Sequence, residues 1–194
     1  MNPTQVDESR GPWILTYTGK QFHLLEPRIE EISLVDIAHS LATQVRFTGH
    51  CCVPYHIADH CVRVAEEVEK LDPSLALCAL LHDASETYLV DLPRPLKHDT
   101  PLGNPYLQIE ALVEQAIARK FDLPYPMPPL VKEFDNRLLM TERRDLMHPG
   151  GPQWEATRYG QSGEPLPGTI IPRDWARSKR DFLAMALRLI VKSK

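Results

Sequence analysis

The adjacent pair His82–Asp83 constrains this chain more than any other feature of its sequence. The pair follows an apolar run over residues 75–81, whose composition predicts a helix inside the core. A buried carboxylate without a partner would be strongly unfavourable there or would take up a proton. A divalent metal ion removes this penalty, because it binds a neutral imidazole nitrogen and a carboxylate oxygen together. The sequence therefore predicts a metal site around His82 and Asp83.

The bulk composition limits the class of protein. A length of 194 residues fits one domain, so we expect residues 1–194 to form a single domain. Hydrophobic residues make up 43% of the chain, yet no apolar run is long enough for a membrane span. The first residues lack the features of a secretory signal and the four cysteines have no CxxC spacing, so we expect a cytoplasmic protein with reduced thiols. The net charge of −4 argues against a protein that coats a nucleic-acid polymer.

The order of predicted elements indicates an all-α fold with one small N-terminal β-hairpin. Two short β-type segments flank Thr18-Gly19-Lys20, and we expect the hairpin and its lead-in to cover residues 13–30. Apolar spacing predicts helices that begin near Ser33 and that cover residues 57–70, 74–90, 105–120 and 130–147. Residues 148–173 contain five Gly and five Pro, so we expect a long loop that is mobile or packs on a neighbouring subunit. Asp174 can cap a last helix over 174–192.

Four potential metal-binding side chains follow one another along the chain in an order that favours one shared site. His60 precedes the pair His82–Asp83 by 22 residues, and Asp135 follows Asp83 by 52, each on its own predicted helix. Alone, His60 or Asp135 would be interpreted as an ordinary core or surface side chain. Glu86 follows Asp83 by three residues, so a continuous helix would place it on the same face as the pair. In combination, these residues favour a shared site over separate ordinary roles.

The order H…HD…D resembles that of the HD-domain superfamily of metal-dependent phosphohydrolases. The likeness covers roughly residues 13–147, and its most specific parts are ALLHDASE at 79–86, DLPRPLK at 91–97 and DNRLLMTE at 135–142. These motifs look like the short bacterial and phage branch, which includes bacterial 5′-deoxynucleotidases and small phage deoxynucleoside triphosphate phosphohydrolases. The resemblance implies an HD-domain helical bundle.

The resemblance also implies roles for individual residues. The metal ligands would be His60, His82, Asp83 and Asp135, around one divalent ion of Mn, Co, Fe, Ni or Zn, with Mg²⁺ as a possible partner of the substrate phosphates. Glu86 would orient or deprotonate the attacking water, and Asp91 would lie near the leaving group.

Further residues are candidates for binding the substrate or supporting the site. Arg46, Lys97 and Lys132 would hold phosphate oxygens, with Arg94 behind them. Phe47 would form a wall against the sugar. Glu142 would lie behind the metal ligands.

The sequence thus leads us to expect an enzyme that removes phosphate from (deoxy)nucleotides by attack of a metal-activated water, as a 5′-deoxynucleotidase does. Two alternatives stay open, a deoxynucleoside triphosphate phosphohydrolase and a non-catalytic, metal-loaded module that binds nucleotide. The expected partner is a small-molecule nucleotide, not a nucleic-acid polymer or a membrane. By analogy with relatives of this size, we expect a homo-oligomer. The base, the sugar, the number of phosphates and the metal are left open.

Overall fold

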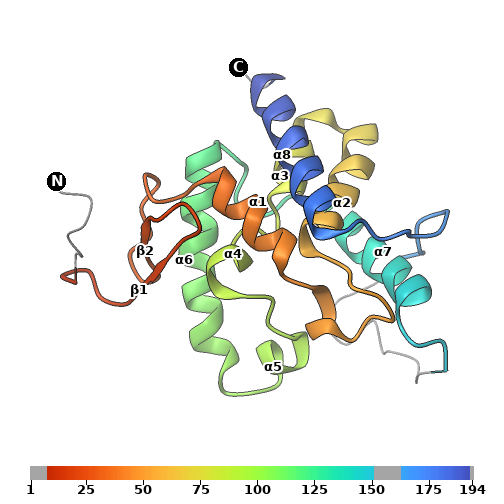
Figure 1. The fold of residues 1–194 in the computed structure, drawn as a ribbon, viewed down its shortest axis with the longest axis horizontal. Helices are drawn as coiled ribbons and strands as arrows, with labels where there is room; N and C mark the ends of the chain where they lie inside the picture. The colour runs from red at the N-terminus through yellow and green to blue at the C-terminus, as the bar shows by residue number, and fades with distance from the viewer. Residues whose placement is uncertain (1–7, 151–162, 193–194) are drawn as a thin grey trace.

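The computed structural model describes residues 8–150 and 163–192, which form a mostly helical fold with one antiparallel hairpin (Figure 1). The hairpin pairs β1 (Trp13–Leu15) with β2 (Gln21–His23). In its turn, Thr18 donates its backbone N–H over 2.6 Å and its hydroxyl over 2.8 Å to the carboxylate of Asp36 on α1 (Leu34–Thr43). The hairpin is thereby fixed to the first helix. The prediction of a mostly helical fold with a small N-terminal hairpin is confirmed.

Most predicted helices are found within a few residues of their expected bounds. The elements after α1 are η1 (Arg46–Gly49), α2 (Ile57–Leu71), η2 (Pro73–Leu75), α3 (Ala76–Leu80), α4 (Glu86–Leu89), α5 (Arg94–His98), α6 (Gly103–Phe121), α7 (Pro129–Leu146) and α8 (Trp175–Lys192). Asp174 caps α8 as predicted, because its carboxylate accepts the N–H of Arg177 over 2.8 Å. Within 8–150 and 163–192, none of these helices has the length and apolar character that a bilayer span requires.

Helix α2 is the central element of the fold. It packs against α1, α3, α7 and α8, and α8 (blue in Figure 1) also packs against α1 and α3. Apolar and small side chains occupy most positions of α2, so the helix is buried along much of its circumference. A side chain that projects from such a helix is held rigidly, and His60 is one of them.

The predicted helix over 74–90 is interrupted, which corrects the sequence-based expectation. Helix α3 ends at Leu80, residues 81–85 form turns, and α4 begins at Glu86. Within and after these turns, the N–H groups of Ala84, Glu86 and Tyr88 bond to carbonyl groups three residues earlier, at 3.0–3.1 Å. Adjacent residues of a regular helix point about 100° apart, so they cannot aim at one point. The interruption allows His82 and Asp83 to do so.

Part of the predicted loop over 148–173 can be described. Residues 151–162 lie outside the described part of the chain. Residues 163–173 run without regular structure along α7, where Leu166 donates its N–H to Thr141 Oγ1 over 2.7 Å and Ile170 donates to the Asp145 carboxylate over 2.8 Å. Leu166 and Ile170 are buried. This part of the loop packs on its own chain, so its burial does not require the neighbouring subunit that we had expected as one option.

Candidate metal centre

The four predicted metal ligands converge where α2, the turn after α3 and α7 meet. His60 Nε2 lies 3.2 Å from His82 Nε2, 3.6 Å from Asp83 Oδ2 and 3.3 Å from Asp135 Oδ1. His82 Nε2 lies 3.3 Å from Asp83 Oδ2 and 3.9 Å from Asp135 Oδ1. One ligand atom each of His60, His82 and Asp83 falls within 4.8 Å of the others. This buried cluster can hold a metal ion.

The chemistry of the cluster fits a divalent cation. When both rings are neutral and carry their protons on Nδ1, the two Nε2 lone pairs face each other at 3.2 Å, and a proton or a cation between them removes the repulsion. A cation placed among them would bind both nitrogens and the carboxylate oxygens around them. Imidazole together with carboxylate suits Mn, Fe, Co, Ni and Zn better than the all-oxygen sites that Ca²⁺ prefers.

Each imidazole ring is oriented by a hydrogen bond at its other nitrogen. His60 Nδ1 lies 2.6 Å from Oε1 of Glu142, which is fully buried on α7. His82 Nδ1 lies 2.7 Å from the backbone carbonyl oxygen of Ala79. Both contacts place a proton on Nδ1 and leave Nε2 directed at the cluster. This arrangement is the usual support of a metal-binding histidine, and Glu142 provides it for His60.

The ionisable groups of the cluster shift one another's pKa values. Burial and Arg46 act to lower the pKa of His60, but Glu142 and Asp135 raise it to about 9. Burial acts to raise the pKa of Asp83 and that of Asp135, yet contacts with the two histidines lower both pKa values far below the usual range. The two carboxylates are therefore ionised, and a proton on His60 offsets part of their charge. A divalent cation would replace that proton.

Glu86 lies next to the cluster but in different surroundings. Its Oε2 atom is buried and has no hydrogen-bond partner among the described residues. Burial, and then the negative charges of Asp83 and Asp91, raise the pKa of Glu86 well above its usual range. Its backbone carbonyl accepts a hydrogen bond from Gln44 Nε2 over 3.0 Å, which fixes the start of α4 against the end of α1. A partly buried carboxylate with a raised pKa is typical of a general acid or base.

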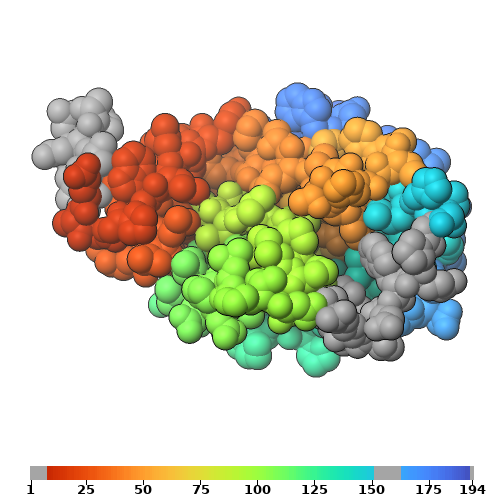
Figure 2. Space-filling model, turned by 90° about the horizontal axis from the view of Figure 1, so that it is seen from below, coloured from red at the N-terminus to blue at the C-terminus, as the bar shows by residue number. Residues whose placement is uncertain are grey.

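Three members of the cluster, His82, Asp83 and Asp135, line an open cleft with a volume of about 370 Å³. Six carboxylates line this cleft against four Lys and Arg side chains, and this acidic excess favours a bound cation. The carboxylates belong to Asp83, Glu86, Asp91, Glu110, Glu114 and Asp135, and the cations are Arg46, Arg94, Lys97 and Lys132. In the space-filling view of Figure 2, the segment that includes α4 and α5 (yellow-green) lies between the N-terminal hairpin (red) and the end of α7 (cyan).

The structure gives Arg46 and Phe47 different positions. Arg46 lines the cleft and is 8% exposed, with Nε 3.1 Å from Glu142 Oε2 and Nη1 3.4 Å from Asp83 Oδ2. Phe47 and Thr48 have φ values of 54° and 51°, a left-handed region that is strained for these side chains. Within the described residues Phe47 does not line the cleft, and its ring centroid lies 5.4 Å from the Arg46 guanidinium carbon instead. The structure thus brings Arg46, but not Phe47, to the site.

The predicted lysines line the cleft and are paired with carboxylates. Lys97 Nζ lies 2.8 and 3.0 Å from the two carboxylate oxygens of Glu110. Lys132 Nζ lies 2.7 Å from Asp135 Oδ2, and an Arg94 Nη2 atom lies 3.6 Å from the same oxygen. A phosphate would have to share or displace these carboxylates. Asp91 also lines the cleft, as the resemblance implied.

Two carboxylates of the cleft were missed in the sequence. Glu110 and Glu114 lie one turn apart on α6, and Ile117 continues the same face. Burial, followed by the charge of Glu110, raises the pKa of Glu114 to about 7. The sequence did carry a signal for these two residues, because Glu110 and Glu114 interrupt an otherwise apolar face of the predicted helix.

The chain is similar to two bacterial proteins. It is 37% identical over 142 residues to the uncharacterized protein YfdR of Escherichia coli strain K12, in a match that covers 73% of this chain and 76% of YfdR. It is 32% identical over 126 residues to an uncharacterized protein of Rhodobacter capsulatus, covering 62% of this chain and 63% of that relative. No protein-family model matches the chain. Because neither relative's name states an activity, the function has to be argued from the site.

Proposed function

This chain belongs to the family of Escherichia coli YfdR, and we propose that it is a metal-dependent phosphohydrolase of the HD type that removes phosphate from nucleotides. One observation carries the proposal. His60, His82 and Asp83 converge beside Glu86, whose buried Oε2 atom has no hydrogen-bond partner in the part of the chain that the structure describes. Such an arrangement combines a place for a divalent ion with a group that can move a proton.

The residues of the cleft divide the work of hydrolysis between them. His60, His82, Asp83 and Asp135 would hold one ion of Mn, Co, Fe, Ni or Zn. Such an ion supplies charge that polarises a phosphoryl group and lowers the pKa of a nearby water. Glu86 takes a proton from the attacking water as the new P–O bond forms.

The bond to the leaving oxygen then breaks, and that oxygen receives a proton. The raised pKa of Glu86 suits it to keep the proton that it accepts and to pass it on. Asp91, which lines the same cleft, is the second candidate for this transfer. Water and a phosphate ester are consumed, and an alcohol and inorganic phosphate are released.

The cations of the cleft have two roles in this proposal. Lys97, Lys132 and Arg94 offset charge on the phosphate oxygens as the reaction proceeds. Arg46 acts instead as a positioning residue, because it is buried against Glu142 and Asp83 and so holds one metal ligand and the support of another.

The size and charge of the cleft favour a small substrate. A volume of about 370 Å³ and four cations suit a nucleotide, and an extended basic surface for a polymer is not needed. We place a deoxynucleoside monophosphate first and a triphosphate second, in line with the resemblance of the HD and DLPRPLK motifs. A nucleotide-binding module without turnover is the less favoured alternative, because such a module has no use for a carboxylate like Glu86, whose Oε2 is buried and has no partner within residues 8–150 and 163–192.

A phosphate-release screen tests the proposal. The protein is stripped with a chelator, reloaded with Mn²⁺, Co²⁺ or Mg²⁺ in turn, and assayed with deoxynucleoside mono-, di- and triphosphates. We expect release from at least one deoxynucleotide, loss of release with the chelator, and recovery with a transition metal. The released anion (phosphate, pyrophosphate or triphosphate) identifies the reaction. Tight nucleotide binding without release under any metal would replace the enzyme by the binding module, and the absence of both would overturn the proposal.

A further inference from the structure

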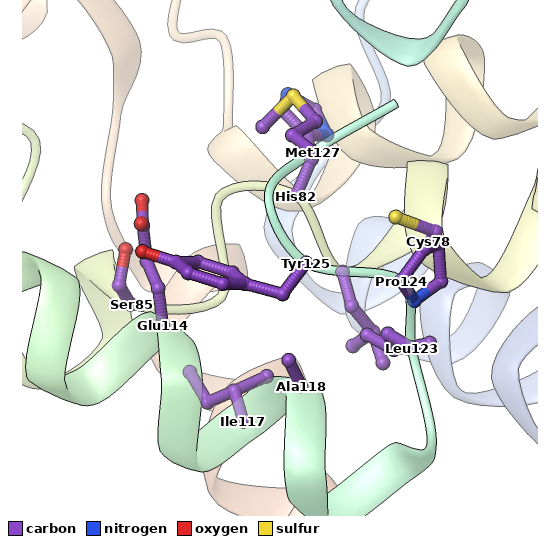
Figure 3. Close-up of a pocket in the computed structure, with 11 residues that line it drawn as sticks. Cys78, His82, Ser85, Glu114, Ile117, Ala118, Leu123, Pro124, Tyr125 and Met127 are labelled. Carbon is purple, nitrogen blue, oxygen red and sulfur yellow. The ribbon is translucent and has the colours of Figure 1, made fainter. Parts of the chain in front are cut away.

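An apolar pocket opens beside the cleft and has no role in the hydrolysis described above (Figure 3). Its volume is about 60 Å³, and α3 with its following turn, α6 and the connector between α6 and α7 surround it. The apolar wall consists of Cys78, Leu81, Ile117, Ala118, Leu123, Pro124 and Met127. His82, Ser85, Glu114 and Met127 line both the pocket and the cleft. A molecule with its phosphate at the metal cluster can therefore extend into the pocket.

Three polar groups of the pocket gather at one side. Figure 3 shows the Ser85 hydroxyl, the Glu114 carboxylate and the Tyr125 hydroxyl on the same side, away from Leu123 and Pro124. Among residues 8–150 and 163–192, the Glu114 side chain makes no hydrogen bond and no ion pair. An ionised carboxylate accepts hydrogen bonds and donates none. Glu114 is thus an unused acceptor at the point where the pocket meets the cleft.

The pocket suits a flat ring with a donor on its edge. Apolar side chains and the aromatic ring of Tyr125 can cover the faces of a heterocycle, while Glu114 meets its edge. The volume of about 60 Å³ does not enclose a whole ring, so a base would lie partly in the adjoining cleft, and the single ring of a pyrimidine would be accommodated more readily than the double ring of a purine. Cytosine carries an amino group at the position where uracil and thymine carry a carbonyl oxygen. The amino group would donate to Glu114, whereas the carbonyl oxygen would face it with like polarity.

We propose that this pocket binds the base of the nucleotide substrate, and that Glu114 selects cytosine over uracil and thymine. The inference rests on the proposed function, because it takes a nucleotide phosphate in the cleft as its starting point. It goes beyond that function by naming the base and the residue that reads it.

The test compares dCMP with dUMP, two substrates that differ at this edge of the ring. The Mn²⁺-loaded protein is assayed at pH 8, and each kcat/KM is expressed relative to that of deoxyribose 5-phosphate, which has no base. A hydrogen bond to a charged group corresponds to a preference for dCMP of about 10- to 100-fold. In Glu114→Gln the amide can also donate to the uracil carbonyl, so we expect the preference to fall to about threefold or less. Glu30→Gln, an exposed change that lines neither pocket nor cleft, should keep the full preference.

The outcomes separate this inference from the proposed function. If nucleotides are hydrolysed but dCMP and dUMP react equally, or if Glu114→Gln leaves their ratio unchanged, the base pocket is refuted and the hydrolase stands. If no nucleotide is hydrolysed, the hydrolase fails, and calorimetric titration of dCMP and dUMP into the Mn²⁺-loaded protein decides the pocket alone. The pocket is supported if dCMP binds more tightly than dUMP and Glu114→Gln abolishes this difference. It is refuted if the two nucleotides bind equally or if neither binds.

Discussion

His60 and His82 offer the same nitrogen to the cluster but are supported in different ways. His60 projects from α2, a continuous helix packed against α1, α3, α7 and α8. Its ring is held by Glu142, which lies 82 residues away in the sequence. His82 lies in the interruption between α3 and α4, and its ring is held by the carbonyl of Ala79, three residues away. One ligand depends on a long-range contact with a side chain, and the other on the local backbone.

The comparison explains why the interruption matters. The continuous helix α2 contributes one proposed ligand, whereas the turn over residues 81–85 contributes two adjacent proposed ligands and leads directly to Glu86. The irregular backbone gives up regular helical hydrogen bonds and gains three functional side chains within five residues. The site is therefore densest where the helix is broken, and it is most dependent on packing where the helix is intact.

The largest effects are expected from removing the two histidines. His60→Ala and His82→Ala should each abolish metal binding and activity, because each removes a ligand. The metal-free variants should differ in stability. His60→Ala leaves the buried Glu142 carboxylate without one partner and should cost roughly 1–3 kcal/mol more than His82→Ala. Urea denaturation in the presence of a chelator measures this difference, and equal losses would contradict the contrast between the two supports.

Glu86→Gln should act on turnover rather than on metal binding. Positioned proton transfer contributes about 10²–10⁴ in rate, so kcat should fall by that order while bound metal stays near the wild-type amount. Metal analysis and kinetics on the same preparation check this. If Glu86→Gln loses its metal, Glu86 is a metal ligand. If Glu86→Gln keeps a normal kcat, Glu86 has no part in the mechanism.

Glu142→Gln tests the long-range support of His60. The amide oxygen can still accept from Nδ1, but the charge that Arg46 and His60 both contact is lost. Loss of such a supporting group commonly lowers metal affinity about 10–100-fold. Competition with a metal indicator measures the affinity. Glu133→Gln, an exposed change on the same helix, is the control and should leave the affinity unchanged. A normal affinity in Glu142→Gln would show that packing alone orients the His60 ring.

The smallest expected effect is on the free energy of unfolding and comes from Glu114, whose carboxyl group senses the charges of Glu110, Lys97 and Asp83. Its pKa is about 7 in the folded protein against 4.5 ordinarily, so the folded state binds more protons than the unfolded state between these values. The contribution to stability is therefore present at low pH and is lost as pH rises through this range. Relative to wild type, Glu114→Gln should gain on the order of 1 kcal/mol between pH 5 and pH 8, after allowance for solvent screening. Urea denaturation of both metal-free proteins checks this, and parallel pH profiles would contradict it.

Much of the fold could be predicted from spacing, because α2, α6, α7 and α8 follow long amphipathic patterns. The break at residues 81–85 could not, since Leu80, Leu81 and Ala84 favour helices and the spacing from His82 to Glu86 fits one. Tertiary contacts of the two ligands override that local preference.

In the candidate site too, part could be predicted from the sequence pattern and part depends on tertiary packing. Its four proposed ligands follow from the resemblance that their order carries, and the structure brings them together. The partners of these residues depend on packing between distant elements. The Glu110 contact of Lys97 has no local signature, because it joins two different helices. The strained turn at Phe47 and Thr48 has none either, because φ > 0 is unusual for Phe and Thr.

The contacts of Glu142 also have a consequence for the synthesis of the chain. Glu142 bonds to Arg46 across 96 residues and to His60 across 82, and α7 leaves the ribosome after both partners. Closing loops of this length is unfavourable until the intervening elements have packed, so we expect the site to form late in folding. A growing chain then lacks the oriented His60 ring and the Asp135 carboxylate that complete the cluster. An ion bound at the proposed site would thus be taken from those free around the finished molecule, and not during its synthesis.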